Sequence, residues 1–285
     1  MNRAPSNIRE SGVEPDGVGT KSFLRMRGIS SEQLSTGLMP RTHREKNMSG
    51  REFCAPDNSN YPKWSSWDVF KWQALSEKFG GGRAYLTAYK DGWVVYNKNR
   101  IVEIAKQEKI PPVLLASVAW AEVGGKPDGT KKPVFFERSL QTWFNQRGGA
   151  PGIYDKPPGG TSVGAVSIQM RNAARELGLS IEEMSFSDQV AMLNCLNTDV
   201  FNLTVVAKHL RGLVLHDYPS AGTAHLTDEQ FIAAGARYNR GTTRPLADIT
   251  NSIKLPPGAR GREYSEYGRR MIEHREHVSR LLNRF

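Results

Sequence analysis

A carboxyl group closes the most apolar run of this sequence, at a position where the run itself predicts burial. The run reads PPVLLASVAWA, and it is followed by Glu122, a valine and two glycines. Proline suits the first turn of a helix, so we expect a helix to begin at Pro112. At helical spacing Glu122 continues the stripe formed by Leu114, Leu115 and Val118.

An acid in that position favours proton-transfer chemistry. Burial against apolar side chains disfavours the carboxylate, and so does the negative end of the helix dipole, so both effects raise the pKa of Glu122. A carboxyl group that stays protonated near neutral pH can act as a general acid. The two glycines leave room for a ligand to come close. The alternative is a structural role, in which Glu122 caps a loop or pairs with Lys126.

The elements that would position this acid are mostly helical. Residues 1–60 are rich in Ser, Gly, Arg, Asn and Pro without periodicity, and we interpret them as a flexible N-terminal arm. Residues 61–285 then form one domain. We expect a helix after Trp64, with Ser66 as its cap and Gly80 as its stop. The dipeptide Asp91-Gly92 between two strand-like pieces predicts a β-hairpin.

The rest of the chain predicts helices separated by one long loop. A Thr227-x-x-Gln230 pattern is typical of a capping box. The fold class is therefore mainly α (α+β), a helical domain with a small β-hairpin. The remaining expected segments are helices over 99–109, 188–215 with a break near residue 198, and 262–283, and a loop-rich stretch over 126–163.

Composition limits the partners. The net charge of +10 favours an anionic partner, but the basic residues are spread along the chain without a nucleic-acid motif, so we expect no nucleic acid. The longest apolar run is too short to span a membrane. No zinc or other metal spacing occurs, and we expect neither a metal nor a cofactor. Cys54 and Cys195 form either one disulfide or two thiols. Thiols are favoured because we see no Sec signal peptide, so the chain is made in the cytoplasm.

Four stretches, in order, resemble the lytic transglycosylase and goose-type lysozyme superfamily. The first, KIPPVLLASVAWAEVGG, is similar to the helix that carries the catalytic Glu of that family, which corresponds to Glu122. Val123 stands where Ser is usual. The second, TSVGAVSIQMRNAARELG, matches the family at Ser162 and Gly164. The Gln of the family corresponds either to Gln169, out of step, or to the position of Ser167.

The third and fourth stretches lie nearer the C-terminus. FNLTVVAKHLRGL resembles an Asn-Ile-x-x-Gly-x-x-Tyr-Leu pattern, with His209 in place of Tyr and Val206 in place of Gly. GARYNRG matches an Ala-x-Tyr-Asn-x-Gly pattern at Tyr238 and Asn239, and the resemblance places that Tyr beside the catalytic acid. The expected substrate-binding residues are Ser162, Gly164, Gln169, Tyr238 and Asn239.

The resemblance implies a lysozyme-like fold and cleavage of peptidoglycan glycan strands between N-acetylmuramic acid and N-acetylglucosamine. Glu122 would protonate the glycosidic oxygen. In a transglycosylase it would then deprotonate the C6 hydroxyl, closing a 1,6-anhydro ring. A muramidase that hydrolyses needs a second carboxylate to activate water. The candidates are Glu137, Asp128 and Asp155, and each has the alternative of being a solvated loop acid.

Two other classes of function remain open. GTSVG spells the GxSxG string of a serine esterase, but IYDKPPG before it does not predict the strand that a nucleophile elbow needs. Ser162 is better explained as a groove residue. The His274-x-x-His277 pair has a spacing that could bind a metal, but it lies on a charged helical face, so we interpret it as solvated surface. A catalytically dead glycan-binding module is the second class, because Val123 and the displaced Gln depart from the family pattern.

The expected site of action is the periplasm or cell wall, although we see no signal peptide. This combination predicts an antibacterial toxin delivered to a target cell by a secretion machine such as the type VI system, or alternatively a phage endolysin. A toxin implies a cognate immunity protein that covers Glu122. We expect the arm to dock to the secretion-machine component.

Overall fold

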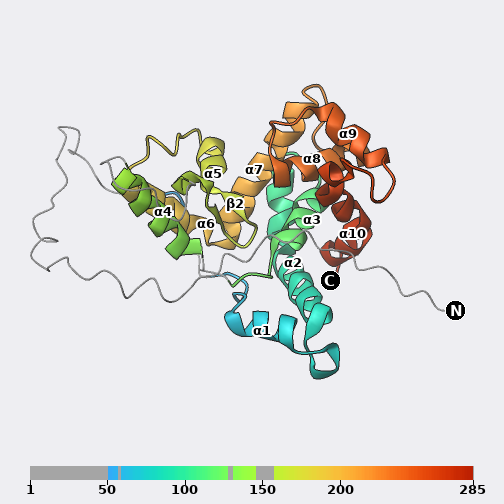
Figure 1. Cartoon of the computed structure of the whole chain (residues 1–285), viewed down its shortest axis with the longest axis horizontal. Coiled ribbons are helices and arrows are strands. Elements are labelled where there is room, and N and C mark those ends of the chain that lie inside the picture. The colour runs from blue at the N-terminus through green and yellow to red at the C-terminus, as the bar shows by residue number, and fades with distance from the viewer. Residues whose placement is uncertain (1–50, 57–58, 128–130, 146–156, 285) are drawn as a thin grey trace, which may run out of the picture. The chain divides into compact units, whose positions relative to one another are not determined.

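A computed structural model describes residues 51–56, 59–127, 131–145 and 157–284, with side chains left out for 143–145. This part of the chain is mostly helical with one small antiparallel sheet, so the mainly α prediction is confirmed (Figure 1). Residues 1–50 of the expected arm lie outside it. The elements are α1 (Ser66–Ala74), η2 (Glu77–Phe79), α2 (Gly82–Gln107), α3 (Pro112–Glu122), α4 (Lys131–Asn145), η3 (Pro158–Gly160), β1 (Ser162–Val163), β2 (Ile168–Gln169), α5 (Met170–Glu176), α6 (Phe186–Leu196), α7 (Asp199–Asp217), α8 (Asp228–Arg240), α9 (Leu246–Lys254), η4 (Arg262–Ser265) and α10 (Glu266–Leu282).

The hairpin predicted at Asp91-Gly92 is wrong, because α2 runs unbroken through both residues. Gly92 is required there by a close approach. A Cβ at this position would lie 2.3 Å from the hydroxyl oxygen of Tyr61. The Asp91 carboxyl group accepts hydrogen bonds from Nε1 of Trp120 and from Nε2 of His277, each at 2.8 Å. The turn-like residues therefore serve packing of the helix, not a turn.

Helix α3 lies in the centre of the domain, against α2 and α10 (Figure 1). It begins at Pro112 as predicted, and the predicted stripe of Leu114, Leu115 and Val118 is fully buried. The helix ends after Glu122, where the backbone becomes extended. Its central position fixes where that carboxyl group lies.

Two local predictions need correction: the cap and end of the first helix, and the loop over 126–163. The cap of α1 is Ser65, not Ser66: the Ser65 hydroxyl accepts from the Asp68 amide at 3.3 Å, and the Asp68 carboxyl accepts from the Ser65 amide at 2.7 Å. The helix also stops earlier than predicted, at Ala74, and Gly80 instead ends the separate short helix η2 in the left-handed region. The loop predicted over 126–163 contains α4, which forms because Phe135 fills the core.

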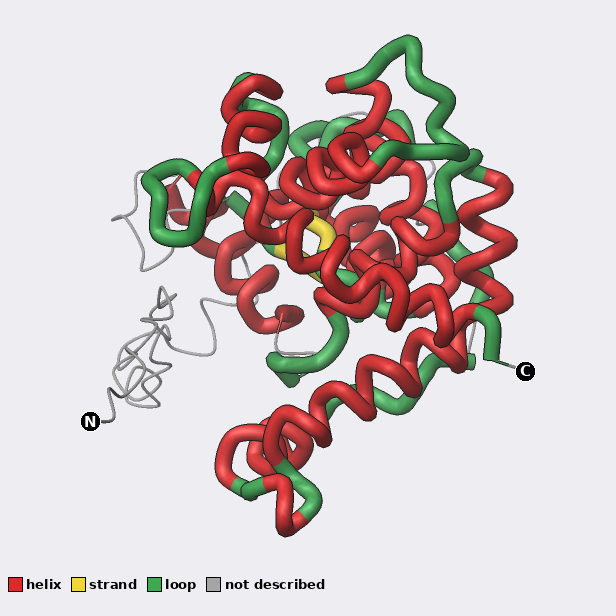
Figure 2. The backbone as a smooth tube through the Cα atoms, turned by 90° about the vertical axis from the view of Figure 1, so that its right-hand side faces the viewer, coloured by secondary structure: helices red, strands yellow, loops and turns green. Residues whose placement is uncertain are grey.

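The C-terminal predictions are confirmed. Helices α6 and α7 are separated at Thr198, and Thr227 forms a capping box with Gln230. The last helix begins as η4 and continues as α10. The two short strands, yellow in Figure 2, are surrounded by helices. Within the described residues no single helix is long and apolar enough to cross a bilayer, although the bent pair α6 and α7 passes that test together.

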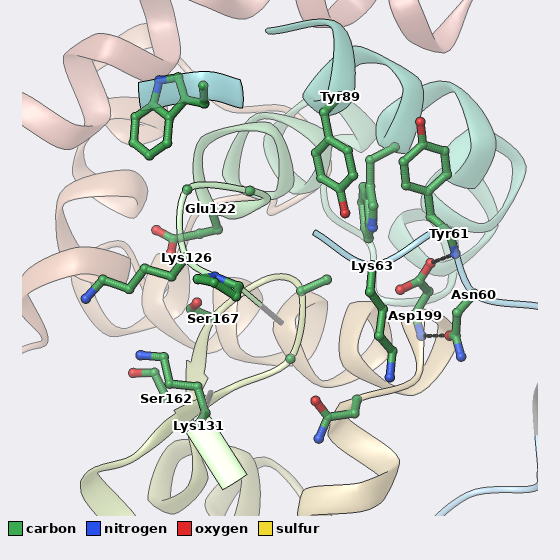
Figure 3. Close-up of a pocket in the computed structure, with 18 of the residues that line it drawn as sticks. Asn60, Tyr61, Lys63, Tyr89, Glu122, Lys126, Lys131, Ser162, Ser167 and Asp199 are labelled. Carbon is green, nitrogen blue, oxygen red and sulfur yellow. Dashed lines mark hydrogen bonds between the residues drawn. The ribbon is translucent and has the colours of Figure 1, made fainter. Parts of the chain in front are cut away.

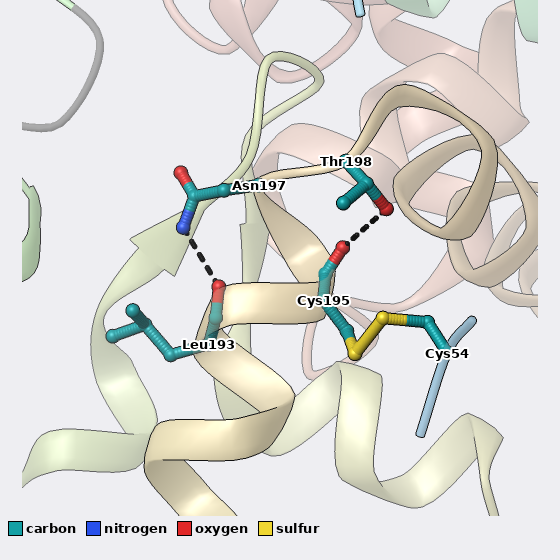
Figure 4. The surroundings of a disulfide bond; sticks show 5 residues. All are labelled: Cys54, Leu193, Cys195, Asn197 and Thr198. Carbon is teal, nitrogen blue, oxygen red and sulfur yellow. Dashed lines mark hydrogen bonds between the residues drawn. A yellow bond between two sulfur atoms is a disulfide. The ribbon is translucent and has the colours of Figure 1, made fainter. Parts of the chain in front are cut away.

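Cys54 and Cys195 form a disulfide, with their Cα atoms 5.7 Å apart and 141 residues between them in sequence (Figure 4). The expectation of two thiols is therefore wrong. Sequence could not reveal the pairing, because only the fold brings Cys54 to the last turn of α6. Beyond the disulfide, the Asn60 side-chain oxygen accepts from the Asp199 amide at 2.7 Å, and the Tyr61 amide donates to the Asp199 carboxyl group at 2.9 Å. Residues assigned to the arm thus fasten onto the helical domain from Cys54 onward.

Candidate functional site

Two hollows meet at Glu122. The first has a volume of about 580 Å³ and the second about 800 Å³. Both are lined by Glu122, Ser162 and Ser167, so the acid and the edge of the small sheet stand where the two hollows join. Together they form one groove, with Glu122 between its two branches.

The first hollow lies between the Tyr61 segment, α2 and the loop after α3 (Figure 3). Gly124 and Gly125 line it, as expected of residues that leave room for a ligand. Besides Glu122, the aromatic and charged residues that line this branch are Tyr61, Lys63, Trp72, Tyr89, Trp93, Lys126, Lys131 and Asp199. Rings and basic groups side by side suit a polymer that has apolar faces and negative charges.

The second hollow lies between α5 and α8. Besides Glu122 and Ser162, it is lined by three further residues expected from the sequence: Gln169, Tyr238 and Asn239. Its charged lining is mainly basic, with Arg171, Arg175, Arg237 and Arg240 against Glu122 and Glu182. This branch also suits a ligand that carries negative charge.

The environment of Glu122 favours its protonated form. Burial is the largest influence on the pKa of Glu122 and raises it. Tyr267 opposes this by donating a hydrogen bond from its hydroxyl to Oε1 at 2.7 Å, and Lys90, Lys131 and Arg270 oppose it by their charge. The net direction is upward. Among the described residues Lys126 forms no ion pair with Glu122, so the loop-pairing alternative is not the one adopted.

Lys90 opposes the expected contribution of the helix end. Its ammonium group donates to the carbonyl oxygens of Trp120 and Ala121, at 2.8 and 2.9 Å. These are carbonyls of the last turn of α3, which would otherwise carry the negative end of the dipole. The positive charge of Lys90 lowers the pKa of Glu122, so burial alone raises it.

Two tyrosines complete the surroundings of the acid. The rings of Tyr238 and Tyr267 are stacked with centroids 6.4 Å apart, and the Tyr238 hydroxyl donates to the carbonyl of Ser167 at 3.0 Å. Burial and the nearby Glu122 raise the pKa of both tyrosines well above 10. Both therefore remain neutral phenols that can donate hydrogen bonds.

The turn between β1 and β2 presents Ser162 to the groove. Ser162 pairs with Gln169 and Val163 with Ile168. Gly164 follows with a φ of +90°, and a Cβ there would lie 2.2 Å from the side-chain nitrogen of Asn202. Asn202 itself accepts from the Val166 amide at 2.9 Å and donates to its carbonyl at 3.1 Å. Only glycine fits this turn.

The nucleophile elbow suggested by GTSVG does not form. Ser162 lies in a strand of two residues that is followed by a turn and a second strand. His209, one of the histidines that follow in sequence, instead contacts Glu176 through Nδ1 at 2.9 Å. The groove position of Ser162 is the one observed.

Of the candidate second acids, the structure describes only Glu137. Glu137 is exposed on α4 and lines neither hollow. Asp128 and Asp155 lie outside the described residues. Within the described part, no carboxyl group is among those that shift the pKa of Glu122. Asp199 and Glu182 line the groove, but Asp199 is bonded to the Tyr61 segment and Glu182 is exposed.

No cluster of three or more His, Cys, Asp or Glu side chains suited to a metal occurs in the described ranges. The His274 and His277 rings both pack on Trp120, with centroids 4.6 and 5.9 Å away. His277 also bonds to Asp91. This pair serves to join α10 to α2 and α3.

Sequence reasoning missed two residues that act directly on the acid. These are Tyr267, which lies within the helix predicted over 262–283, and Lys90, and the sequence analysis singles out neither. Their type gave a weak signal: a tyrosine on a buried stripe needs a hydrogen-bond partner, and a lysine that faces the core needs acceptors.

Comparison with protein-family models, curated proteins and solved structures found no match for this chain.

Proposed function

We propose that this protein has a lysozyme-like domain that cleaves peptidoglycan glycan strands, with Glu122 as its acid. The observation that carries the proposal is convergence. Glu122, Ser162, Gly164, Gln169, Tyr238 and Asn239 come from three stretches of the sequence, and all line the two joined hollows. Lysozyme-like enzymes are expected to bind a glycan along such a groove, with the acid at the bond that breaks.

Glu122 starts the reaction as a protonated acid and donates its proton to the glycosidic oxygen between N-acetylmuramic acid and N-acetylglucosamine. Its raised pKa supplies the protonated form. Tyr267 holds Oε1, which leaves Oε2 to face the sugar. After transfer, the Tyr267 hydroxyl and the charges of Lys90, Lys131 and Arg270 stabilise the carboxylate.

The carboxylate then takes the proton of the muramoyl C6 hydroxyl. That oxygen attacks the anomeric carbon and closes a 1,6-anhydro ring, so a second carboxylate is not needed. We favour this transglycosylase route over hydrolysis because no described carboxyl group shifts the pKa of Glu122. Hydrolysis would require a base to activate water, and two carboxyl groups within reach of the scissile bond.

We further propose that the protein acts outside the cytoplasm, as an antibacterial toxin delivered by a secretion machine. The Cys54–Cys195 disulfide supports an oxidising site of action such as the periplasm. A toxin of this kind needs an immunity protein, and the groove at Glu122 is the surface it would cover. A phage endolysin would use the same chemistry.

The test is mass spectrometry of purified peptidoglycan after digestion with the wild type, Glu122→Gln and Glu137→Gln. Glu137→Gln is the matched control, because it makes the same change at an exposed position outside the groove. We expect products that end in 1,6-anhydromuramic acid from the wild type and the control. Glu122→Gln should lose roughly a hundredfold or more in rate, as removal of a general acid does.

Other products lead to defined conclusions. Reducing-end muramic acid means that the enzyme is a hydrolase. If Glu137→Gln keeps its activity, the search for the base then turns to Asp128 and Asp155, and if it does not, Glu137 is the base. If the wild type releases no soluble product, the enzyme proposal fails on this substrate. Retained sedimentation with peptidoglycan would then identify a glycan-binding module.

A further inference from the structure

A third, smaller hollow lies on the other side of Tyr267 from the groove. Its volume is about 160 Å³, and it is enclosed by α2, α3 and α10. The polar and aromatic residues that line it are Lys90, Ser117, Trp120, Tyr267, Arg270 and His274. Its lining contains basic groups and hydroxyls, and neither Asp nor Glu is among the described residues that line it.

The inner end of this hollow carries an unsatisfied hydroxyl. Ser117 is 2% exposed, and its Oγ has no hydrogen-bond partner. A buried hydroxyl without a partner is unfavourable, because it has lost its hydrogen bonds to water and gained none in exchange. Ser117 therefore indicates a ligand atom that accepts or donates a hydrogen bond there.

The basic side chains that line the hollow favour a negatively charged ligand. The Lys90 ammonium uses two of its three donors on the carbonyls of Trp120 and Ala121, which leaves one. Within the described part of the chain, the Arg270 side chain has no hydrogen-bond or ion-pair partner. Burial lowers the pKa of Lys90 to about 8, Glu122 opposes this by its charge, and Arg270 adds to it.

The mouth of the hollow is open. Arg270 and His274 are exposed, while Ser117 closes the far end. The His274 ring packs on Trp120 and so stays at the rim. A ligand can enter from solvent past these two basic side chains without passing through the groove.

We propose that this hollow binds a small oxyanion. Its oxygen atoms accept hydrogen bonds from the Ser117 hydroxyl, the free donor of Lys90 and the guanidinium of Arg270. The size of the hollow suits an ion such as phosphate and excludes a glycan, which separates this site from the groove. Charge-assisted bonds of this kind are the strongest hydrogen bonds in proteins.

The bound anion has a consequence for Glu122, which rests on the proposed function. Lys90 on α2, Lys131 on α4 and Arg270 on α10 lower the pKa of Glu122, and Tyr267 does so through its hydrogen bond. An anion on Lys90 and Arg270 offsets two of these positive charges. Glu122 then stays protonated to a higher pH, so the loss of activity on the alkaline side moves upward.

Isothermal titration calorimetry of the full chain with inorganic phosphate tests the binding, at constant ionic strength in a zwitterionic buffer. The variants are Arg270→Gln and Ser117→Ala. Arg280→Gln is the matched control, because Arg280 is exposed on the same helix and lies outside the hollow. We expect saturable binding to the wild type and the control, about tenfold weaker binding to Arg270→Gln, and a smaller loss for Ser117→Ala.

The proposal is overturned if phosphate shows no saturable binding. It is also overturned if phosphate binds equally to the wild type, Arg270→Gln and Ser117→Ala. The same proteins then give the second measurement, the pH profile of glycan cleavage with and without phosphate at equal ionic strength. The alkaline limb should move to higher pH in the wild type and stay in place in Arg270→Gln. Phosphate binding without that movement refutes the coupling to Glu122. Because calorimetry needs no substrate, failure of the anion site and failure of the proposed function are distinguishable.

Discussion

The first hollow contains two acids whose surroundings differ, and Figure 3 shows them at separate ends. Asp199 accepts from the Tyr61 amide at 2.9 Å and from the Asn97 side chain at 3.1 Å, while its own amide donates to Asn60. These bonds tie three segments of chain together. Among the described residues, one side chain donates a hydrogen bond to the Glu122 carboxyl group, the phenol of Tyr267, and this carboxyl group lies at the end of a central helix. A buried carboxyl group that accepts several hydrogen bonds has a structural role, because it connects the segments that donate them. A carboxyl group with few hydrogen-bond donors remains able to exchange a proton.

The largest expected effect on the free energy of unfolding concerns the end of the first hollow at which Asp199 lies. Cys54→Ala combined with Cys195→Ala should lower the free energy of unfolding by about 3–4 kcal/mol, because the disulfide closes a very long loop. Urea denaturation measures this. The Tyr61 segment should become less ordered, so the KM for glycan should rise. The pH at which activity falls on the alkaline side, which depends on Glu122, should not change. Reductant should weaken the wild type and leave the double variant unchanged; equal stability of reduced and oxidised wild type would contradict the prediction.

The next effect separates the two acids directly. Asp199→Asn should cost about 2–3 kcal/mol, because its carboxyl oxygen would lose hydrogen bonds from buried donors. Glu122→Gln should cost nothing at neutral pH. A raised folded-state pKa means that Glu122 favours folding below its unfolded pKa and that this contribution is lost as pH rises through the folded value.

Glu122→Gln should therefore become more stable than the wild type as pH rises above the ordinary glutamate pKa of 4.5. Urea midpoints measured from pH 4 to 8 test this. A gap that shrinks with rising pH would mean that Glu122 is held as a carboxylate, and would assign it the structural role that Asp199 has.

A smaller effect concerns the single donor to the acid. Tyr267→Phe should lower stability by about 1 kcal/mol, the usual net value of one hydrogen bond. Without the phenol the pKa of Glu122 rises further, so the alkaline limb of activity should move to higher pH. Tyr264→Phe is the matched control, because Tyr264 lines neither hollow. A limb that moves to lower pH would show that Tyr267 does not stabilise the carboxylate.

The smallest effect is expected at an exposed acid. Glu182 lines the second hollow and lies in solvent. Glu182→Gln should change the free energy of unfolding by less than about 0.5 kcal/mol and the cleavage rate by less than roughly twofold. A loss comparable with that of Glu122→Gln would identify Glu182 as a second functional carboxyl group and favour hydrolysis.

The parts of the fold that the sequence predicted depend on neighbours in sequence. Pro112 begins α3, Thr227 caps α8 with Gln230, and the spacing of Leu114 and Val118 places Glu122 on the buried stripe. Each of these signals lies within a few residues. The same local evidence predicted that burial raises the pKa of Glu122, and the burial of this side chain in the fold acts in that direction.

The parts that it missed depend on contacts between distant residues. Asp91-Gly92 has the local chemistry of a turn, but Tyr61 and Trp120 determine its role in α2. Tyr267 reaches Glu122 across 145 residues of sequence. The disulfide spans 141. No periodicity or spacing encodes such partners, since they arise only when helices pack.

The junction of the two hollows has a mechanical consequence. A polymer that fills both branches passes over Glu122 with chain continuing on either side. On the proposed substrate, cutting would not wait for a strand end, and one cut near the middle would halve a strand. The tensile load that a cell wall carries depends on strand length, so a few turnovers per strand would weaken the wall before much soluble material was released.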